Sequence, residues 1–175
     1  MSANALWTGK LLEELEKCGQ SGTDAVRFLR ERRIRIGIRR QSAGARWTLW
    51  RTIELSPRYV QGSSGAPYAL SLVVHEIRHI KQGPATALSV YGELEAWHVQ
   101  FTFLLELTGG YGGVPGQAGL IKELLALPLG WDRSVLRTAR LLMRKYAGRK
   151  YRVDLLPLYP LQHEVMYRLA RRRPG

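Results

Sequence analysis

Apolar positions recur along the chain with two spacings, and the change between them divides it into helical and extended segments. Where apolar residues lie three and four apart, as Leu11, Leu12 and Leu15 do, one face of a helix is predicted. This spacing predicts helices over residues 3–17, 21–33, 69–82, 88–107, 118–126, 134–146 and 161–172. Ser21, Gly83 and Pro84 are typical of helix boundaries and support these limits.

Strict alternation of apolar and polar residues marks the extended part of the chain. Residues 34–38 alternate through three isoleucines, and residues 46–56 alternate again after a turn at "QSAGA". We expect the two runs to pair as an antiparallel hairpin. The predicted fold class is therefore α+β, with a small antiparallel sheet packed on helices and one domain spanning residues 1–175.

Composition and charge narrow the class of protein. With 175 residues, 45% of them apolar, the chain can bury a substantial core. The net charge of +13 is concentrated in two stretches: residues 27–51 hold nine basic side chains and one acidic, and residues 131–175 hold twelve basic and three acidic. No apolar run is long enough to span a membrane. A single cysteine, Cys18, and the lack of a secretory signal predict a cytoplasmic protein.

Two of the four histidines lie four residues apart in "VVHEIRHIKQG". On a helix, His75 and His79 share one face, and Glu76 lies one step round it. This H-E-x-x-H arrangement is typical of a zinc site in which both histidines are ligands and the glutamate is the general base. The alternative is a pair of surface histidines on an amphipathic helix.

A catalytic zinc needs a third protein ligand, and the next helix offers three candidates. The stretch "YGELEAWHVQ" contains Glu93, Glu95 and His98. Glu93 and Glu95 diverge by about 200° on a helix, so only one of them can face the histidines. Glu93 shares its side with Trp97, which we interpret as a packing residue, whereas Glu95 shares its side with polar residues.

The His75-Glu76-x-x-His79 motif, followed on the next helix by Glu95-Ala96, resembles the gluzincin zinc metallopeptidases, in particular the small single-domain minigluzincins. The resemblance covers residues 30–108 and leaves residues 109–175 as a helical, basic extension. It implies a zincin-like fold, bound Zn²⁺, catalytic Glu76, and metal ligands His75, His79 and Glu95, with Glu93 and then His98 as the alternatives.

The resemblance also implies a substrate and a mechanism. A peptide or protein substrate would pair with an edge strand before the zinc helix, for which residues 46–56 are the candidate, and the arginines there would favour acidic substrates. Such families stabilise the oxyanion with a tyrosine or histidine. The candidates here are Tyr91, His98, Tyr111 and His163, and the sequence does not choose among them.

The basic stretch suggests a second function. Arg133, Arg137, Arg140 and Arg144 form one stripe of a predicted helix, which residues 149–152 extend. Weak, nonspecific nucleic-acid binding through residues 133–152 would follow from such a stripe, and so would a plain solvated face. The alternative function is therefore a nucleic-acid-associated regulator whose zinc site is structural or vestigial. The sequence leaves the oligomeric state open.

Overall fold

The structure of the protein is a computed structural model that describes residues 3–48, 52–60, 62–113, 116–148 and 151–165. Its elements, in chain order, are α1 (Ala3–Glu16), α2 (Gly19–Glu31), β1 (Arg35–Ile38), β2 (Ala45–Thr48), β3 (Thr52–Leu55), α3 (Pro57–Val60), α4 (Pro67–Gln82), α5 (Pro84–Ala87), α6 (Val90–Thr108), η1 (Tyr111–Gly113), α7 (Ala118–Leu125), α8 (Arg133–Ala147) and η2 (Arg152–Leu155). A further helical turn covers residues 161–165. The α+β class is confirmed, and the rest of the helix expected over 161–172 lies outside the described residues.

The sheet differs from the predicted hairpin. It has the strand order β1-β3-β2, with β1 parallel to β3 and β2 antiparallel to β3. The run read as one strand over residues 46–56 is in fact two strands, β2 and β3, which pair with each other through Thr48 and Thr52. The expectation of a wholly antiparallel sheet was wrong, because alternation locates extended segments but does not say which of them pair.

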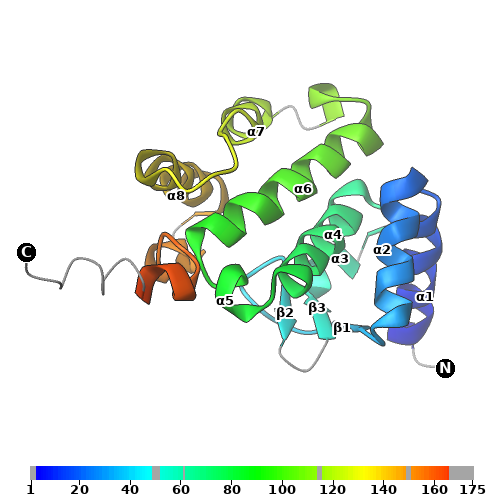
Figure 1. Cartoon of the computed structure of the whole chain (residues 1–175). Coiled ribbons are helices and arrows are strands. Elements are labelled where there is room, and N and C mark those ends of the chain that lie inside the picture. The colour runs from blue at the N-terminus through cyan, green and yellow to red at the C-terminus, as the bar shows by residue number, and fades with distance from the viewer. Residues whose placement is uncertain (1–2, 49–51, 61, 114–115, 149–150, 166–175) are drawn as a thin grey trace, which may run out of the picture.

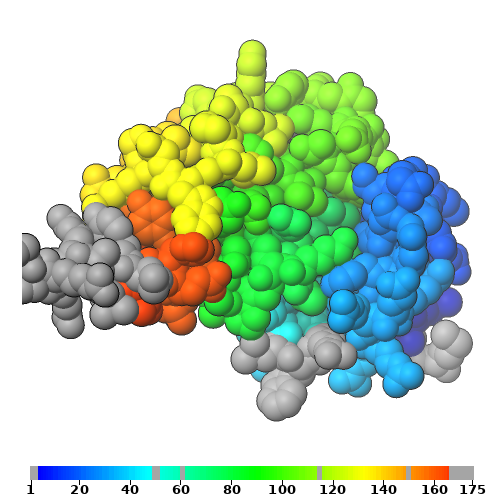
Figure 2. Space-filling view, in the orientation of Figure 1, coloured from blue at the N-terminus to red at the C-terminus, as the bar shows by residue number. Residues whose placement is uncertain are grey.

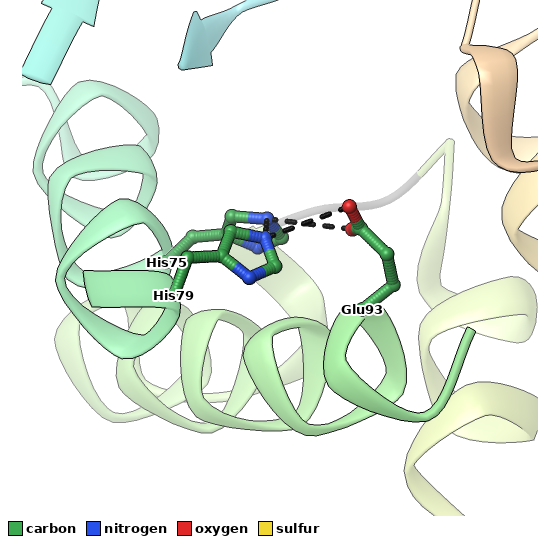
Figure 3. Close-up of side chains that lie close together, drawn as sticks. All are labelled: His75, His79 and Glu93. Carbon is green, nitrogen blue, oxygen red and sulfur yellow. Dashed lines mark hydrogen bonds and ion pairs between the residues drawn. The ribbon is translucent and has the colours of Figure 1, made fainter. Parts of the chain in front are cut away.

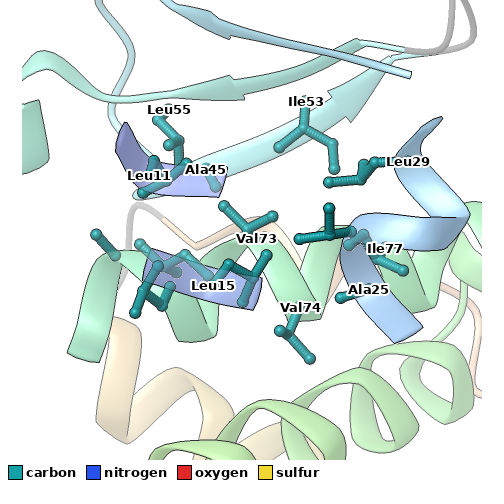
Figure 4. Close-up of a cluster of buried hydrophobic side chains, with 14 of the residues drawn as sticks. Leu11, Leu15, Ala25, Leu29, Ala45, Ile53, Leu55, Val73, Val74 and Ile77 are labelled. Carbon is teal, nitrogen blue, oxygen red and sulfur yellow. The ribbon is translucent and has the colours of Figure 1, made fainter. Parts of the chain in front are cut away.

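One apolar core lies between the sheet and the helices of the first half of the chain (Figure 4). Ile53 and Leu55 of β3 are fully buried and face Val73 and Ile77 of α4. Leu15 of α1 belongs to the same core. Helix α4 is buried along most of its length, including both histidines. It is therefore held rigidly, as a helix that carries a binding site must be.

A second apolar core is formed by buried side chains of α6, α7 and α8, together with Val153. Helix α6 runs through the centre of the molecule beside α4, with α1 and α2 on one side and α7 and α8 on the other (Figure 1). The space-filling view shows the same order, with the C-terminal segments and the N-terminal helices at opposite ends and α4 to α6 between them (Figure 2). Tyr68 of α4 contacts both cores, so the α4–α6 interface joins the two halves.

A short connection fixes how α6 approaches α4. Helix α4 ends at Gln82, the following Gly83 has a φ of 76°, and α5 begins at Pro84. The Ser89 hydroxyl then caps α6 by accepting a hydrogen bond from Gly92 N at 3.0 Å. A Cβ on Gly92 would lie 2.1 Å from Thr86 O, so only glycine fits here. This close approach sets the position of the first turn of α6.

Near its C-terminus, the chain comes back to contact the first turn of α6. Val90 N donates to Pro157 O at 2.8 Å, and Tyr91 N donates to Leu158 O at 3.1 Å. These bonds satisfy amides that the first turn of a helix leaves without partners. The described part of residues 109–165 therefore packs on α6. Among the described residues, no helix is both long enough and apolar enough to cross a membrane.

Candidate metal centre

Two helices bring three metal-ligating side chains together. His75 and His79 project from α4 toward Glu93 of α6 (Figure 3). The two Nε2 atoms lie 3.0 Å apart. Glu93 Oε2 lies 3.7 Å from Nε2 of His75, and Glu93 Oε1 lies 3.6 Å from Nε2 of His79. Two imidazole nitrogens and a carboxylate therefore point at one place between α4 and α6.

The spacing and chemistry of these donors fit zinc. Two ligand atoms at the usual distances from a tetrahedral zinc lie about 3.3 Å apart. The observed separations of 3.0, 3.6 and 3.7 Å lie on either side of that value. Imidazole nitrogen and carboxylate oxygen are both common zinc ligands, and a set of three leaves one position open, as catalytic sites require.

Glu93, and not the expected Glu95, lies beside the two histidines. The Glu95 carboxylate accepts hydrogen bonds from Gln82 at 2.7 Å and Tyr91 at 2.9 Å, and lies 3.1 Å from a guanidinium nitrogen of Arg78. The two glutamates diverge on the helix, so with Glu93 facing the histidines of α4, Glu95 points elsewhere. His98, the last candidate, bonds Leu124 O instead, at 2.9 Å.

Trp97 is buried in the second apolar core, as expected of a packing residue, and it also hydrogen-bonds at the site. Its indole N–H lies 3.3 Å from Glu93 Oε2 and donates to the Tyr151 hydroxyl at 2.9 Å. Its ring lies 6.2 Å from that of His75. A tryptophan one turn after a glutamate places a hydrogen-bond donor on the same helix face. In the sequence, this spacing is the signal that could have identified Glu93 as the third ligand.

The histidines are buried, with exposed fractions of 6% for His75 and 2% for His79, so the surface-pair interpretation does not hold. Burial lowers the pKa of His75 to about 3, and the neighbouring His79 adds to this effect. Burial would also lower the pKa of His79, but the Glu93 carboxylate outweighs it and raises that pKa to about 9. Glu93 therefore favours the protonated form of His79, and burial favours the neutral form of His75.

Glu76 is buried beside the histidines, with 5% of its surface exposed. Burial raises the pKa of its carboxyl group to about 7, although His79 and the backbone N–H of Trp47 act in the opposite direction. Trp47 belongs to β2, and its ring lies 6.4 Å from that of His79. A carboxyl group with a pKa near neutrality can both accept and donate a proton, as a general base must.

Tyr151 reaches the site from the C-terminal third of the chain. Its hydroxyl donates a hydrogen bond to Glu93 Oε2, and burial raises the pKa of the phenol well above its usual value. Tyr151 was not among the expected oxyanion residues. Of those, Tyr91 bonds Glu95, Tyr111 is exposed, and His163 lies against the ring of Trp131.

A cavity of about 320 Å³ adjoins the cluster. His75, Glu76 and Tyr151 line it, together with Tyr59, Tyr68 and Tyr146. Ala45, the first residue of β2, and the preceding Gly44 form another part of its wall. The candidate metal centre therefore borders a space large enough for a side chain and a strand that lies at a sheet edge.

Two arginines of the expected basic stripe on α8 make contacts within the chain. Arg140 donates to Leu156 O at 2.6 Å, and Arg144 lies 3.4 Å from Asp154. Arg133 and Arg137 are exposed on α8, while Arg149 and Lys150 lie outside the described residues.

Comparison of the chain with protein-family models, with curated proteins and with solved structures finds no match.

Proposed function

We propose that the protein is a zinc-dependent metallopeptidase with a zincin-like fold. The observation that carries the proposal is the convergence of His75, His79 and Glu93 beside the buried Glu76. The arrangement of a small sheet, an H-E-x-x-H helix and a following glutamate helix supports it. A structural site would not need a carboxyl group of near-neutral pKa next to its ligands.

His75, His79 and Glu93 would hold the metal. When bound, zinc would supply a Lewis acid for the scissile carbonyl and lower the pKa of a water molecule. Glu76 takes a proton from the attacking water while the water oxygen forms a bond to the carbonyl carbon. The same carboxyl group then donates that proton to the leaving amine when the C–N bond breaks. Tyr151 holds the Glu93 carboxylate through its hydrogen bond.

Fewer residues could pair with a substrate peptide than the sequence suggested. Within residues 46–56, β3 is the central strand, and only β2 lies at an edge where a peptide could pair. Arg46 of β2 lies 2.6 Å from Glu54, so its charge is already paired and gives little support to a preference for acidic substrates. Arg51 lies outside the described residues. The tyrosines of the cavity favour a large apolar or aromatic substrate side chain.

The proposal is tested by digesting a mixed peptide library with the zinc-loaded full chain and identifying new termini by mass spectrometry. We expect cleavage by the wild-type protein and a loss of at least 100-fold in the Glu76→Gln variant, which removes only the base. Zinc content is measured in both samples. Equal zinc with unequal cleavage supports the mechanism.

Two outcomes would overturn the proposal. Cleavage by Glu76→Gln at the wild-type rate would assign the activity to another group or to a contaminant. The absence of cleavage by a fully zinc-loaded wild-type protein, across the whole library, would leave a metal-binding protein that is not a peptidase.

A further inference from the structure

We propose that Gln82 and Glu95 position His79 for metal binding, with the Glu95 carboxylate fixing the Gln82 amide and the amide oxygen fixing the imidazole. The inference rests on the proposed metal centre and goes beyond it, because neither residue is one of the three side chains that the structure brings together. It gives Glu95 a role one step removed from the metal.

The first contact lies between Gln82 and the imidazole. Nδ1 of His79 is 3.1 Å from Gln82 Oε1, on the opposite side of the ring from the Nε2 atom that faces His75 and Glu93. An amide oxygen only accepts hydrogen bonds, so it holds the proton on Nδ1. The Nε2 lone pair is then directed at the metal position. A ligand histidine commonly has such a partner on its second nitrogen.

The orientation of the amide follows from its other contacts. Gln82 Nε2 donates to Gly92 O at 2.9 Å and to Glu95 Oε2 at 2.7 Å. Both partners are acceptors only, and they match the two hydrogens of the amide nitrogen. If the amide were reversed, its oxygen would face a carbonyl and a carboxylate, and the amide nitrogen would face His79. The network therefore requires the oxygen to face the imidazole.

Glu95 is itself held from two further directions. Its Oε1 accepts from the Tyr91 hydroxyl at 2.9 Å, and its Oε2 lies 3.1 Å from Arg78. Arg78 belongs to the same helix as His79, and Tyr91 to the same helix as Glu93. The relay His79–Gln82–Glu95 thus ties the ligand of one helix to the backbone and carboxylate of the other, and its rigidity comes from both.

The arrangement differs from a direct contact between a carboxylate and the histidine. An amide placed between them transmits orientation with little added charge. It leaves Glu93, together with the buried Glu76, as the carboxylates that interact directly with the imidazole. Loss of such outer partners typically weakens metal affinity by roughly 10- to 100-fold. We expect that range for Gln82→Leu, and a smaller loss for Glu95→Ala, because Gly92 O still holds the amide.

The test measures zinc affinity by competition with a chromophoric chelator, using the full chain. The variants are Gln82→Leu, Glu95→Ala and the double substitution, with Glu106→Ala on the exposed side of α6 as the matched control. If Glu95 acts through Gln82, the double variant should bind zinc no more weakly than Gln82→Leu alone. Glu106→Ala should bind zinc like the wild type. Thermal unfolding of the metal-free variants confirms that each is folded.

A rescue separates positioning from a general structural role. In the Glu95→Ala background, Gln82→Glu places a carboxylate directly at Nδ1. Its other oxygen then faces Gly92 O, so we expect zinc affinity to rise above that of Glu95→Ala without reaching that of the wild type. In addition, ¹⁵N NMR of the zinc-bound wild type should show His79 protonated at Nδ1 and bound to zinc through Nε2.

The outcomes are distinct. Wild-type affinity in both single variants, independent losses that add in the double variant, or an Nδ1-bound metal would overturn the inference while leaving the metal centre intact. A wild-type protein that binds no zinc at all would overturn the proposed function, and the inference with it.

Discussion

Glu93 Oε1 lies 3.6 Å from Nε2 of His79 across the interface of α6 and α4. The two side chains come from helices that pack along their length and join the two apolar cores. A metal held between them would cross-link these halves, so its binding should stabilise the folded chain by mass action. At a free zinc concentration of 100 times Kd, this amounts to about 2.7 kcal/mol.

The ligand assignment predicts unequal effects for two neighbouring carboxylates. Glu93→Gln keeps the size of the side chain but removes its charge, so we expect stoichiometric zinc binding to be lost. Glu95→Ala should still bind one zinc, with weaker affinity. Zinc content after gel filtration, together with chelator competition, measures both. The opposite ranking would assign the third ligand to Glu95.

Protonation of the cluster predicts how many protons zinc displaces. At pH 6 the medium is below the pKa of His79, about 9, and above that of His75, about 3. Only His79 then carries a proton that zinc must remove, and one proton should be released per zinc. Calorimetric titration of Glu76→Gln in buffers of different ionisation enthalpy counts it without interference from Glu76. Release of nearly two protons would mean that both histidines are charged, against the burial argument.

The close approach at Gly92 predicts a costly substitution. In Gly92→Ala the new methyl group would collide with Thr86 O, a backbone atom that cannot rotate away. We expect a loss of roughly 1–3 kcal/mol in the free energy of unfolding and weaker zinc binding, because Glu93 follows directly. Urea denaturation measures the first effect. The matched control is Gly119→Ala in α7, where nothing lies near the added methyl group, and it should be neutral or slightly stabilising.

The arginines of α8 should separate by their contacts. Arg140→Ala removes the donor to Leu156 O, and we expect it to cost about 1–2 kcal/mol of stability. Arg137→Ala, on the exposed face of the same helix, should change stability by less than about 0.5 kcal/mol. Equal effects in urea denaturation would show that the Leu156 contact does not hold the C-terminal segment.

Local patterns predicted the helices well and the strand pairing poorly. Apolar spacing, with Gly83 and Pro84 as boundary signals, predicted a helix over residues 69–82, and α4 spans Pro67–Gln82. The parallel pairing of β1 with β3 is a contact between distant segments. Alternation carries no information on such pairing, and the sheet topology was therefore beyond the reach of the pattern.

The site was predicted where its spacing is local and missed where it is not. His75 and His79 lie on one face of one helix, and the H-E-x-x-H pattern placed them together. Helix α6 is buried on several sides, so its apolar spacing does not indicate which carboxylate faces α4. Tyr151 reaches Glu93 from 58 residues away, and sequence spacing does not predict such contacts.

The most direct test of the metal centre is a crystal structure of the zinc-loaded protein with anomalous data collected on both sides of the zinc absorption edge. We predict one strong peak between α4 and α6, about 2.0–2.2 Å from Nε2 of His75, Nε2 of His79 and one oxygen of Glu93. The Glu95 carboxylate should remain on Gln82. A peak bound by Glu95 in place of Glu93, or no zinc peak at the two histidines, would contradict the account.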